Sequence, residues 1–499
     1  MIKLKSLASP YRWIPLFLLA LGAALRLYDL TDPPLDYHPS RQLRGAIIAR
    51  SIYYQMLPDA DPLKRELSIS IARSTGRFEA PILETLAAYT YRLLGNEQLW
   101  VGRAYSILFW LIGAFFVYLI AKRATDPDAA LFSLGYMLLL PFAVQGSRVF
   151  QPDPGMTMWI VISGYSLLRW QETLTWRWAL LAGATSGMAV LTKPVAGYIV
   201  FMGALLTVLS RYRFNRALRS LQIWVMASVM AAIPGTYYLS NRQDSILNYY
   251  SNWTASLTYL LKEPSFYVRW ISFLSDLVGF SSIVLGLLGI WLTSSTHFRS
   301  LLIGWWIGYF LYGTTVPYQI YTHSYYSLQL VPILALSLAP VAEVLRERLS
   351  GLEGFWRWSF AFWVVFVVAY PAWISITTAR AEDHRTAPQY WAQIGALLPP
   401  EGKIIALTQS YGYPLMYYGW RKVTLWQSTG EQELAALRRR EKDFEAAFTN
   451  RLEGMDYFLV TALNQFEAQK ELKKALYQRY PLIVEGNGYL IFDLRHPLR

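Results

Sequence analysis

Runs of about twenty mostly apolar residues recur along the first 380 residues of this chain, and they constrain its fold more than any other feature. A helix needs about twenty residues to cross the hydrocarbon core of a bilayer, where every backbone polar group must be hydrogen bonded internally. Charged residues make up 16% of the 499 residues, against roughly 25% in soluble domains. The sequence therefore predicts a polytopic α-helical membrane bundle. We place eleven transmembrane spans, at residues 13–28, 101–121, 129–147, 155–169, 178–192, 195–210, 221–239, 271–293, 300–316, 324–342 and 358–378.

The basic residues predict the orientation of this bundle. The first span has basic residues before it and no small-residue cleavage site after it, which indicates an uncleaved anchor with a cytoplasmic N-terminus. The predicted inner loops then contain twelve basic residues, whereas the short outer connections at 148–154 and 314–323 share one, as the positive-inside rule requires. The net charge of +13 follows from this topology and does not indicate nucleic acid binding. The inner set is Lys122, Arg123, Arg169, Arg177, Arg211, Arg213, Arg216, Arg219, Arg299, Arg346, Arg348 and Arg357.

Two outer loops and a C-terminal domain complete the predicted organisation. The loop at 29–99 is long enough to be folded or functional, and its apolar stretch at 81–94 is read as an interfacial or re-entrant helix because it is too short to span. The loop at 240–270 is expected to contain an amphipathic helix near 246–262. Residues 1–380 would form the catalytic membrane domain, and residues 381–499 a small extracytoplasmic α/β domain. Its expected strands lie at 403–409, 413–418, 456–461, 482–485 and 489–493, and its helices at 386–398, 431–449 and 466–478.

Polar and ionisable residues gather at the predicted outer ends of the helices. An isolated charge near a helix end usually extends to the membrane interface, as we expect for Arg26. Several separated segments that send such groups to one face instead favour a site. The segments are Asp36 to Gln42, Glu79, Arg148 to Pro154, Thr192-Lys193-Pro194, and Tyr321 to Tyr326.

These segments resemble, in order and spacing, motifs of the GT-C glycosyltransferases, in the branch related to protein O-mannosyltransferases and the bacterial aminoarabinose transferase. The resemblance implies a sugar carried on a polyprenyl phosphate as donor, an acceptor hydroxyl, and inversion at the anomeric carbon. Many members of the superfamily begin the first loop with Asp-Glu, whereas here Tyr37 follows Asp36, so Glu79 is our candidate for the second carboxylate. The matching stretches, within residues 10–345, are Asp36-Tyr-His-Pro-Ser-Arg-Gln, Gly102-Arg-Ala-Tyr-Ser, Arg148 to Pro154, Leu191-Thr-Lys-Pro and His323-Ser-Tyr-Tyr.

The residue types themselves predict roles in such a transfer. An acceptor hydroxyl that attacks a sugar carbon needs a general base; Asp36 is the first candidate for it and Glu79 the second. The developing charge on the leaving phosphate calls for cationic or imidazole donors. The predicted substrate-binding residues are His38, Arg41, Gln42, Arg148, Asp153, Lys193, His323, Tyr325 and Tyr326.

The sequence alone allows other roles for some of these residues. The five histidines are scattered and no metal-ligand spacing occurs, but Asp36 and Asp153 could hold a divalent cation between loops. Asp153 could instead be a helix N-cap before Pro154, and Tyr325 and Tyr326 could belong to an interfacial aromatic belt. The chain has no cysteine, which excludes disulfides and thiolate chemistry.

The sequence therefore predicts a glycosyltransferase of the plasma (inner) membrane that acts on the extracytoplasmic face. Its acceptor could be a glycan, a lipid or a protein. A lipid-linked polysaccharide polymerase or ligase is the main alternative, because it uses similar donors on the same face. A lipid or sugar transporter is a weaker alternative, because its ionisable groups would lie near the bilayer midplane, where these spans have few charges.

Overall fold

The structure is a computed structural model that describes residues 10–76, 78–241, 251, 253–349, 354–440 and 443–498. The chain divides into two compact units. The first comprises Met1–Leu30, Arg77–Leu83 and Trp100–Glu382, and the second comprises Thr31–Gly76, Glu84–Leu99 and Asp383–Arg499. Most of the first outer loop therefore packs with the C-terminal domain.

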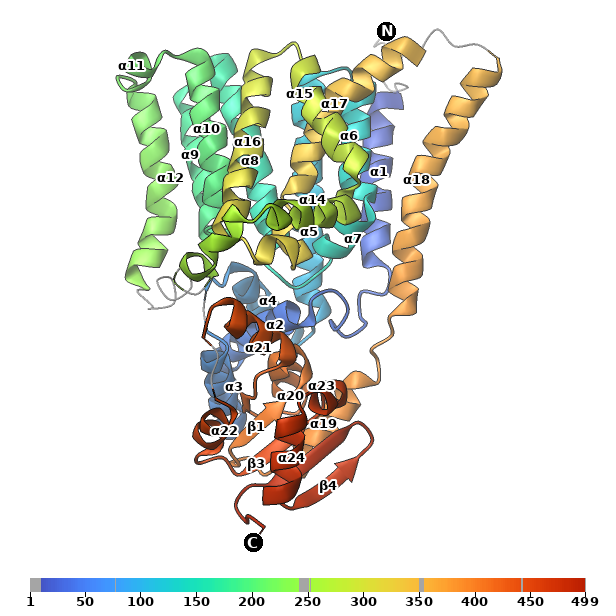
Figure 1. Cartoon of the computed structure of the whole chain (residues 1–499). Helices are drawn as coiled ribbons and strands as arrows, with labels where there is room; N and C mark the ends of the chain where they lie inside the picture. Colours follow the sequence, from blue (N-terminus) through green and yellow to red (C-terminus); the bar gives the residue numbers. More distant parts are fainter. Residues whose placement is uncertain are drawn as a thin grey trace. The chain divides into compact units, whose positions relative to one another are not determined.

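The first unit is a helical bundle, and each predicted span coincides with a helix or a bent pair of helices (Figure 1). The predicted helical membrane fold is confirmed at this level. The long helices are α1 (Pro10–Leu27), α5 (Trp100–Ala124), α8 (Asp153–Thr173), α9 (Trp176–Thr192), α10 (Ala196–Arg211), α12 (Leu221–Ser240), α16 (Thr296–Thr315), α17 (Leu330–Leu349) and α18 (Phe355–Ala381). Shorter elements are α6 (Pro127–Leu139), α7 (Pro141–Ser147), α11 (Phe214–Ala217), α14 (Pro264–Val278), α15 (Phe280–Leu292) and the 3₁₀ turns η2 (Ala255–Lys262), η3 (Gln319–Tyr321) and η4 (Ser324–Ser327).

Glycines allow some of these helices to approach closely. Gly304 and Gly308 lie one turn apart on α16, which packs along α10. A Cβ atom on Gly304 would lie 2.4 Å from the Met202 carbonyl oxygen, and one on Gly308 would lie 2.5 Å from that of Tyr198. Small residues four apart are typical of close helix contacts in membranes, because no larger side chain fits between the backbones.

Among the described residues, three helical segments are individually long and apolar enough to cross a bilayer: α5, α12 and Ser324–Leu349. Two bent pairs raise the number to five: α6 with α7, bent by 59°, and α14 with α15, bent by 95°. Two further apolar helices are shorter, at Trp13–Leu27 and in α10 with 16 residues. The chain is a multi-pass membrane protein, and the count of eleven spans stays a prediction.

The predicted span at 271–293 is not one straight helix. The chain turns at Gly279, whose φ of 82° is rarely adopted by L side chains, and α14 begins at Pro264, inside the segment expected to be a loop. Figure 1 draws α14 across the upright helices. Residues 242–250 and 252 lie outside the described part. In the range near 246–262, where a helix was expected, the longest described element is the 3₁₀ turn η2.

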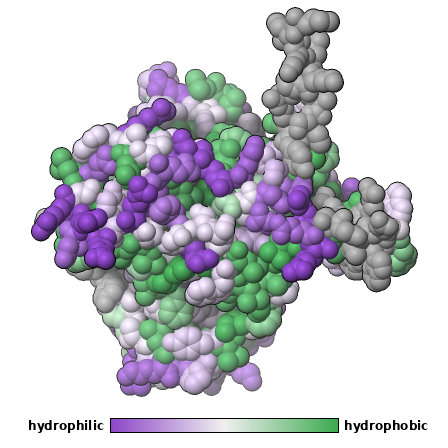
Figure 2. All heavy atoms as spheres, turned by 90° about the horizontal axis from the view of Figure 1, so that it is seen from above, coloured by the Kyte–Doolittle hydropathy of each residue, from purple (hydrophilic) through white to green (hydrophobic). Residues whose placement is uncertain are grey.

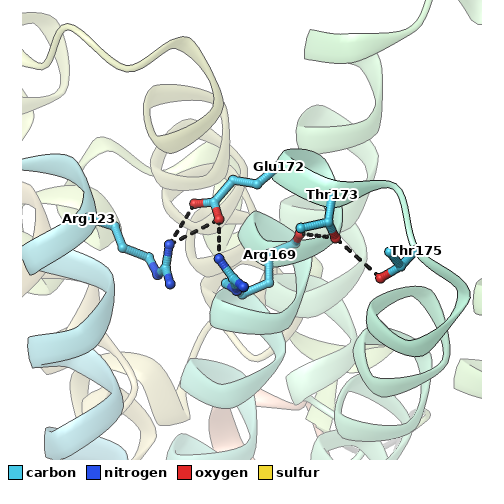
Figure 3. Close-up of polar contacts among 5 residues, drawn as sticks. All are labelled: Arg123, Arg169, Glu172, Thr173 and Thr175. Atoms are coloured by element: carbon cyan, nitrogen blue, oxygen red, sulfur yellow. Dashed lines mark hydrogen bonds and ion pairs between the residues drawn. The ribbon is translucent and has the colours of Figure 1, made fainter.

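The end of the bundle that carries α11 is rich in basic residues. The four arginines between 211 and 219 are exposed there, and Figure 2, which looks down on the molecule from above, shows hydrophilic residues over this face. Arg123 of α5 and Arg169 of α8 both bind Glu172, at 3.0 and 2.5 Å (Figure 3). These residues all belong to the predicted inner loops, so their grouping fits the positive-inside rule. Which side of the membrane they face stays a prediction.

Arg26 corrects one sequence expectation, because its side chain does not extend to the interface. It is fully buried. Its guanidinium donates to Ser147 Oγ at 2.6 Å and to the carbonyl oxygens of Gly22 and Leu138 at 2.9 Å each. These acceptors lie on α1, α6 and α7, so Arg26 connects three helices through charge-assisted hydrogen bonds.

The second unit contains α2 (Pro39–Met56), α3 (Pro62–Ser74) and most of α4 (Ile82–Leu94), together with a five-stranded sheet in the order β2-β1-β3-β5-β4. β1 pairs in parallel with both β2 and β3, whereas β5 is antiparallel to β3 and β4. The strands are β1 (Ile404–Leu407), β2 (Val423–Leu425), β3 (Tyr457–Val460), β4 (Leu482–Gly486) and β5 (Tyr489–Asp493). The helices are α19 (Ala387–Leu397), α20 (Tyr413–Tyr418), α21 (Thr429–Leu437), α22 (Phe444–Leu452), α23 (Leu463–Ala468) and α24 (Lys470–Arg479), with the 3₁₀ turn η5 (Gln409–Gly412).

The sheet differs from the sequence prediction at one strand. Residues 413–418 form α20, and the second strand is β2 instead. Gly412 ends the preceding turn with φ 70°, and Pro414 occupies the first turn of α20, where its missing N–H does no harm. The helices expected at 431–449 and 466–478 are each divided into two shorter ones.

A buried ion pair holds the first-loop helices against the C-terminal domain within this unit. Arg50 of α2 binds Glu97 at 2.7 Å and donates to the Tyr417 carbonyl oxygen at 2.5 Å. Tyr417 donates its hydroxyl to the same Glu97 carboxylate at 3.0 Å, and its ring lies 3.6 Å from the Arg50 guanidinium. Because all three groups satisfy one another, their burial is tolerated.

Candidate active site

A buried ion pair lies where α8 begins and α9 ends. Lys193 Nζ lies 2.7 Å from Asp153 Oδ1, and the exposed fractions of the two side chains are 6% and 0%. Asp153 is the first residue of α8 and Pro152 is the N-cap, so the alternative of Asp153 as an N-cap is wrong. Among the described residues, Asp153 Oδ2 has no hydrogen-bond partner. The pair therefore presents a second carboxylate oxygen that is buried and unsatisfied.

Two tyrosines from η4 complete the environment of Lys193. Its ammonium lies 5.1 Å from the ring centroid of Tyr325 and 4.9 Å from that of Tyr326, which are cation–π distances. Both tyrosines are buried in the protein, so they are not members of an exposed aromatic belt. His323 packs edge-on against them, with ring centroids 5.8 and 6.1 Å away. The structure thus places Lys193 against Asp153. It places Tyr325 and Tyr326 against Lys193, and His323 against the two tyrosines.

Arg148 lies in the same unit but is engaged with backbone groups. Its Nη2 atom donates to the carbonyl oxygens of Tyr28 and Asp29 at 2.8 and 3.1 Å. Arg103 donates to the Arg148 carbonyl at 2.9 Å and to that of Leu30 at 3.3 Å. Basic side chains at the carboxyl end of a helix stabilise its last carbonyl groups. Both arginines therefore fix the way in which the chain leaves α1.

Glu79 belongs to the short segment that packs with the bundle. It lies within electrostatic range of Tyr238 on α12, whose hydroxyl hydrogen bonds to the backbone of Ala80 and donates to the Leu191 carbonyl at 3.1 Å. Leu191 precedes Lys193 by two residues. Glu79 is therefore held near the end of α9, the helix that leads to the buried lysine.

The remaining predicted residues form a separate cluster in the second unit. Gln42 is fully buried, and its amide nitrogen donates to Asp36 Oδ1 at 2.7 Å and to the Tyr37 carbonyl at 2.9 Å. His38 precedes α2 with φ 50° and ψ 62°, a left-handed conformation that is uncommon away from glycine. Gln42, a predicted substrate-binding residue, thereby fixes the position of the Asp36 carboxylate.

Two arginines of α2 lie near Tyr413 in this unit. Burial raises the pKa of Tyr413, while Arg44 and Arg41 act in the opposite direction. Arg44 is buried and donates to the Gly76 carbonyl at 2.8 Å, so it stabilises the end of α3. Arg41 is half-buried, and its backbone N–H donates to the His38 carbonyl at 2.9 Å.

Sequence reasoning missed two polar residues beside Asp153. Gln151 is 1% exposed, and neither of its amide atoms has a partner among the described residues. Thr157 lies one helical turn after Asp153, fully buried, and its hydroxyl also lacks a partner there. The signal for Gln151 was present, because it lies within the motif from Arg148 to Pro154.

The same described residues contain no group of three or more His, Asp or Glu side chains that could hold a metal ion. Asp153 Oδ1 faces an ammonium, which is an unfavourable neighbour for a cation. We therefore do not propose Asp153 as a metal ligand.

Comparison with known proteins identifies the class of this chain. Residues 79–238, about a third of the chain, match the family described as dolichyl-phosphate-mannose-protein mannosyltransferase. A search of curated proteins finds no match. Among solved structures, ArnT from Cupriavidus metallidurans bound to undecaprenyl phosphate is similar, with a TM-score of 0.61, 16% identity, and coverage of 97% of this chain and 98% of that chain.

A second similar structure is the oligosaccharyltransferase AglB from Archaeoglobus fulgidus in complex with an inhibitory peptide and a dolichol-phosphate. Its TM-score is 0.59 at 12% identity, with coverage of 94% of this chain and 72% of that chain. At such identities the likeness concerns the fold, and the family match concerns residues 79–238. Together they confirm the resemblance inferred from the motifs: residues 79–238 match the protein mannosyltransferase family, and the chain shares the fold of ArnT and AglB.

Proposed function

We propose that this enzyme transfers a sugar from a polyprenyl-phosphate carrier to an acceptor hydroxyl on the extracytoplasmic face of the membrane. The family match names a dolichyl-phosphate sugar enzyme, and the two similar structures contain undecaprenyl phosphate and a dolichol-phosphate. A lipid-linked phosphate donor is the substrate class that these proteins have in common.

The observation that carries the donor assignment is the buried Lys193. Its ammonium is enclosed by Asp153 Oδ1 and by the faces of Tyr325 and Tyr326. In a site of low dielectric, a charge-assisted hydrogen bond to phosphate is about twice as strong as a neutral one. A lipid phosphate that approached Lys193 would gain this bond, and His323 would be a second donor near the same rings.

Asp36 is the general base in this proposal. As the acceptor oxygen bonds to the anomeric carbon, the bond from that carbon to the phosphate oxygen breaks, and Asp36 takes the hydroxyl proton. The leaving group departs as polyprenyl monophosphate, stabilised by the cationic donors. Attack from the side opposite the phosphate inverts the anomeric carbon. Glu79 is the second candidate for the base.

Asp36 suits this role because its carboxylate is both held in place and accessible. The Gln42 amide donates to Oδ1 at 2.7 Å, and Asp36 itself is half-buried, so that an acceptor can approach.

A polysaccharide polymerase or ligase is the nearest alternative. It differs in its product: such an enzyme releases polyprenyl pyrophosphate when its donor is a pyrophosphate-linked glycan. A transporter is disfavoured because the buried pair of Asp153 and Lys193 lies at helix ends rather than at mid-helix.

The test of the donor class uses undecaprenyl phosphate that carries a diazirine on its isoprenoid tail. We expect light-dependent labelling of the protein in nanodiscs, competed by unmodified undecaprenyl phosphate and reduced in Lys193→Ala. The matched control is Lys122→Ala, which removes an exposed lysine from the last turn of α5. Labelling that neither the competitor nor Lys193→Ala reduces would contradict the proposal.

A further inference from the structure

The carboxyl edge of the three parallel strands in the C-terminal domain has an unusual chemistry. The loop after β1 contains Thr408 to Gly412, the loop after β2 contains Trp426 to Gly430, and the segment after β3 contains Thr461 to Gln465. These fifteen positions include no charged residue, although the whole chain has 46 basic and 33 acidic residues. The polar side chains on this edge are hydroxyls and carboxamides.

The first two of these loops share a sequence. Gln409-Ser410-Tyr411-Gly412 follows β1 and Gln427-Ser428-Thr429-Gly430 follows β2, so the same Gln-Ser-x-Gly pattern leaves two neighbouring parallel strands. Because the carboxyl ends of parallel strands meet at one edge of a sheet, the two copies lie on the same edge.

This edge is also where the order of the strands reverses. β1 leads to β2 on one side, and β3 leads towards β4 on the other. In open α/β sheets, ligands bind outside the carboxyl ends of the strands at such a switch point. At this point the Thr461 hydroxyl lies 2.8 Å from Thr408 Oγ1 and 2.7 Å from Gln409 Oε1, so the two strand ends are joined by neutral hydrogen bonds.

The loop after β1 has a backbone conformation that needs support from its surroundings. Ser410 and Tyr411 have φ values of 50° and 57°, and Gly412 follows with 70°. Left-handed conformations at residues other than glycine occur preferentially at binding and active sites. Tyr411 is 48% exposed and lies beside Tyr413 at a ring distance of 6.2 Å.

The chemistry of this edge selects among ligands. A nucleotide or another phosphate ester would need a glycine-rich phosphate loop or basic side chains. These three loops have no Lys or Arg, and Arg451, which reaches the end of β2, is engaged with the Leu425 carbonyl at 2.8 Å. A metal ion would need carboxylates or histidines; the loops have neither, and the adjacent Glu431 accepts from the N–H and the hydroxyl of Ser428. A neutral sugar offers hydroxyls that both donate and accept, which match carboxamides and hydroxyls, and an apolar C–H face that fits an exposed aromatic ring.

The edge also adjoins the candidate catalytic segment within the same unit. The loop Gln409–Gly412 contacts α2, which begins directly after Asp36 and His38. Tyr413, next to this loop, lies in the field of Arg41 and Arg44 on α2. A ligand held at the edge would therefore lie next to the helix that positions Asp36.

We propose that the carboxyl edge of β2-β1-β3 is a binding site for a neutral oligosaccharide, with Tyr411 as its aromatic platform and the side chains of Ser410, Gln427 and Asn464 as its hydrogen-bonding groups. The assignment of this oligosaccharide as the acceptor rests on the proposed function. The binding itself does not depend on turnover.

The test measures glycan binding by the intact protein in lipid nanodiscs, because alkyl-glycoside detergents carry sugars that would compete. Fluorescent nanodiscs are applied to a printed array of neutral and acidic oligosaccharides, and the affinity for the strongest neutral binder is then measured by surface plasmon resonance. Tyr411→Ala and Asn464→Ala remove exposed side chains from the edge, and Gln393→Ala removes an exposed carboxamide from α19 as the matched control.

We expect binding to neutral oligosaccharides, weakened about three- to tenfold by the loss of each edge contact, and unchanged in Gln393→Ala. No neutral binder above empty nanodiscs, a preference for acidic glycans, or equal affinity in the edge variants and the control would each overturn the proposal. Failure of the donor proposal would abolish lipid labelling and leave this binding intact, so the two outcomes are distinguishable.

Discussion

Two carboxylates of this protein lie in opposite environments, one in each unit. Asp153 is fully buried in the bundle and faces the Lys193 ammonium at 2.7 Å. Asp36 is half-buried in the second unit and receives the Gln42 amide at the same distance. The Asp153 carboxylate is enclosed with its lysine, whereas an acceptor can reach the half-buried Asp36 carboxylate. The difference supports separate roles: Asp153 positions a cation, and Asp36 accepts a proton.

The two proposed roles require Asp153 and Asp36 to act on the same face of the membrane. A test of this topology has the largest expected effect. In this cysteine-free chain, Asp59→Cys should react with an impermeant maleimide in intact cells, and Thr125→Cys should react after permeabilisation. Asp59 is exposed and belongs to the first outer loop, whereas Thr125 lies between two bundle helices in a predicted inner loop. Labelling of Thr125→Cys in intact cells would reverse the orientation.

The proposed base gives the next largest effect. Asp36→Asn keeps the shape of the side chain and still accepts a hydrogen bond from Gln42, but it cannot take a proton. We expect folded protein with turnover reduced by about 10²–10⁴-fold, as is typical of general-base removal. Glu79→Gln, assayed in parallel, should have the milder defect. Normal turnover in Asp36→Asn with an inactive Glu79→Gln would exchange the two roles.

The ion pair can be tested through stability. Asp153→Asn leaves the Lys193 ammonium buried without its counterion, which should lower the free energy of unfolding by about 3–5 kcal/mol. The double variant Asp153→Asn/Lys193→Met removes both charges and should recover part of this loss. Thermal unfolding in nanodiscs measures both variants. If the double variant is no more stable than the single one, the pair is not what stabilises this end of the bundle.

The smallest expected effect concerns the second unit. Tyr417→Phe removes the hydroxyl that donates to Glu97 but keeps the ring against Arg50. The loss should be about 1 kcal/mol, the net value of a typical hydrogen bond. Hydrogen exchange in α2 would report it as faster opening of that helix. Unchanged exchange in α2 would mean that the pair of Arg50 and Glu97 holds the helix without the hydroxyl.

The bundle could be predicted because an apolar run of membrane length has one stable solution in a bilayer, a helix. The bends could not, because Pro141 and Gly279 permit a change of direction without fixing its angle, which depends on packing. The burial of Arg26 was missed for a related reason: two of its acceptors, Ser147 and the Leu138 carbonyl, lie more than one hundred residues away in sequence.

The site was predicted as a set of residues and not as a set of contacts. Sequence motifs selected Asp153 and Lys193, forty residues apart, but did not pair them. Gln42 was selected because it lies in the same motif as Asp36, but its hydrogen bond to the Asp36 carboxylate was not predicted. Tertiary structure decides which selected residue faces another, because local sequence fixes the helix face and not the neighbouring helix.

The division of roles between the two carboxylate environments is tested most directly by measuring donor-lipid affinity and turnover in the same variants. Tritiated undecaprenyl phosphate binding to nanodiscs gives the Kd for each. We predict that Asp36→Asn binds the lipid with unchanged affinity and loses turnover, whereas Lys193→Ala, and more mildly His323→Ala, weakens lipid binding by about ten- to hundredfold, the cost of a lost charge-assisted hydrogen bond. Unchanged lipid affinity in both Lys193→Ala and His323→Ala, or lost affinity in Asp36→Asn, would contradict the account.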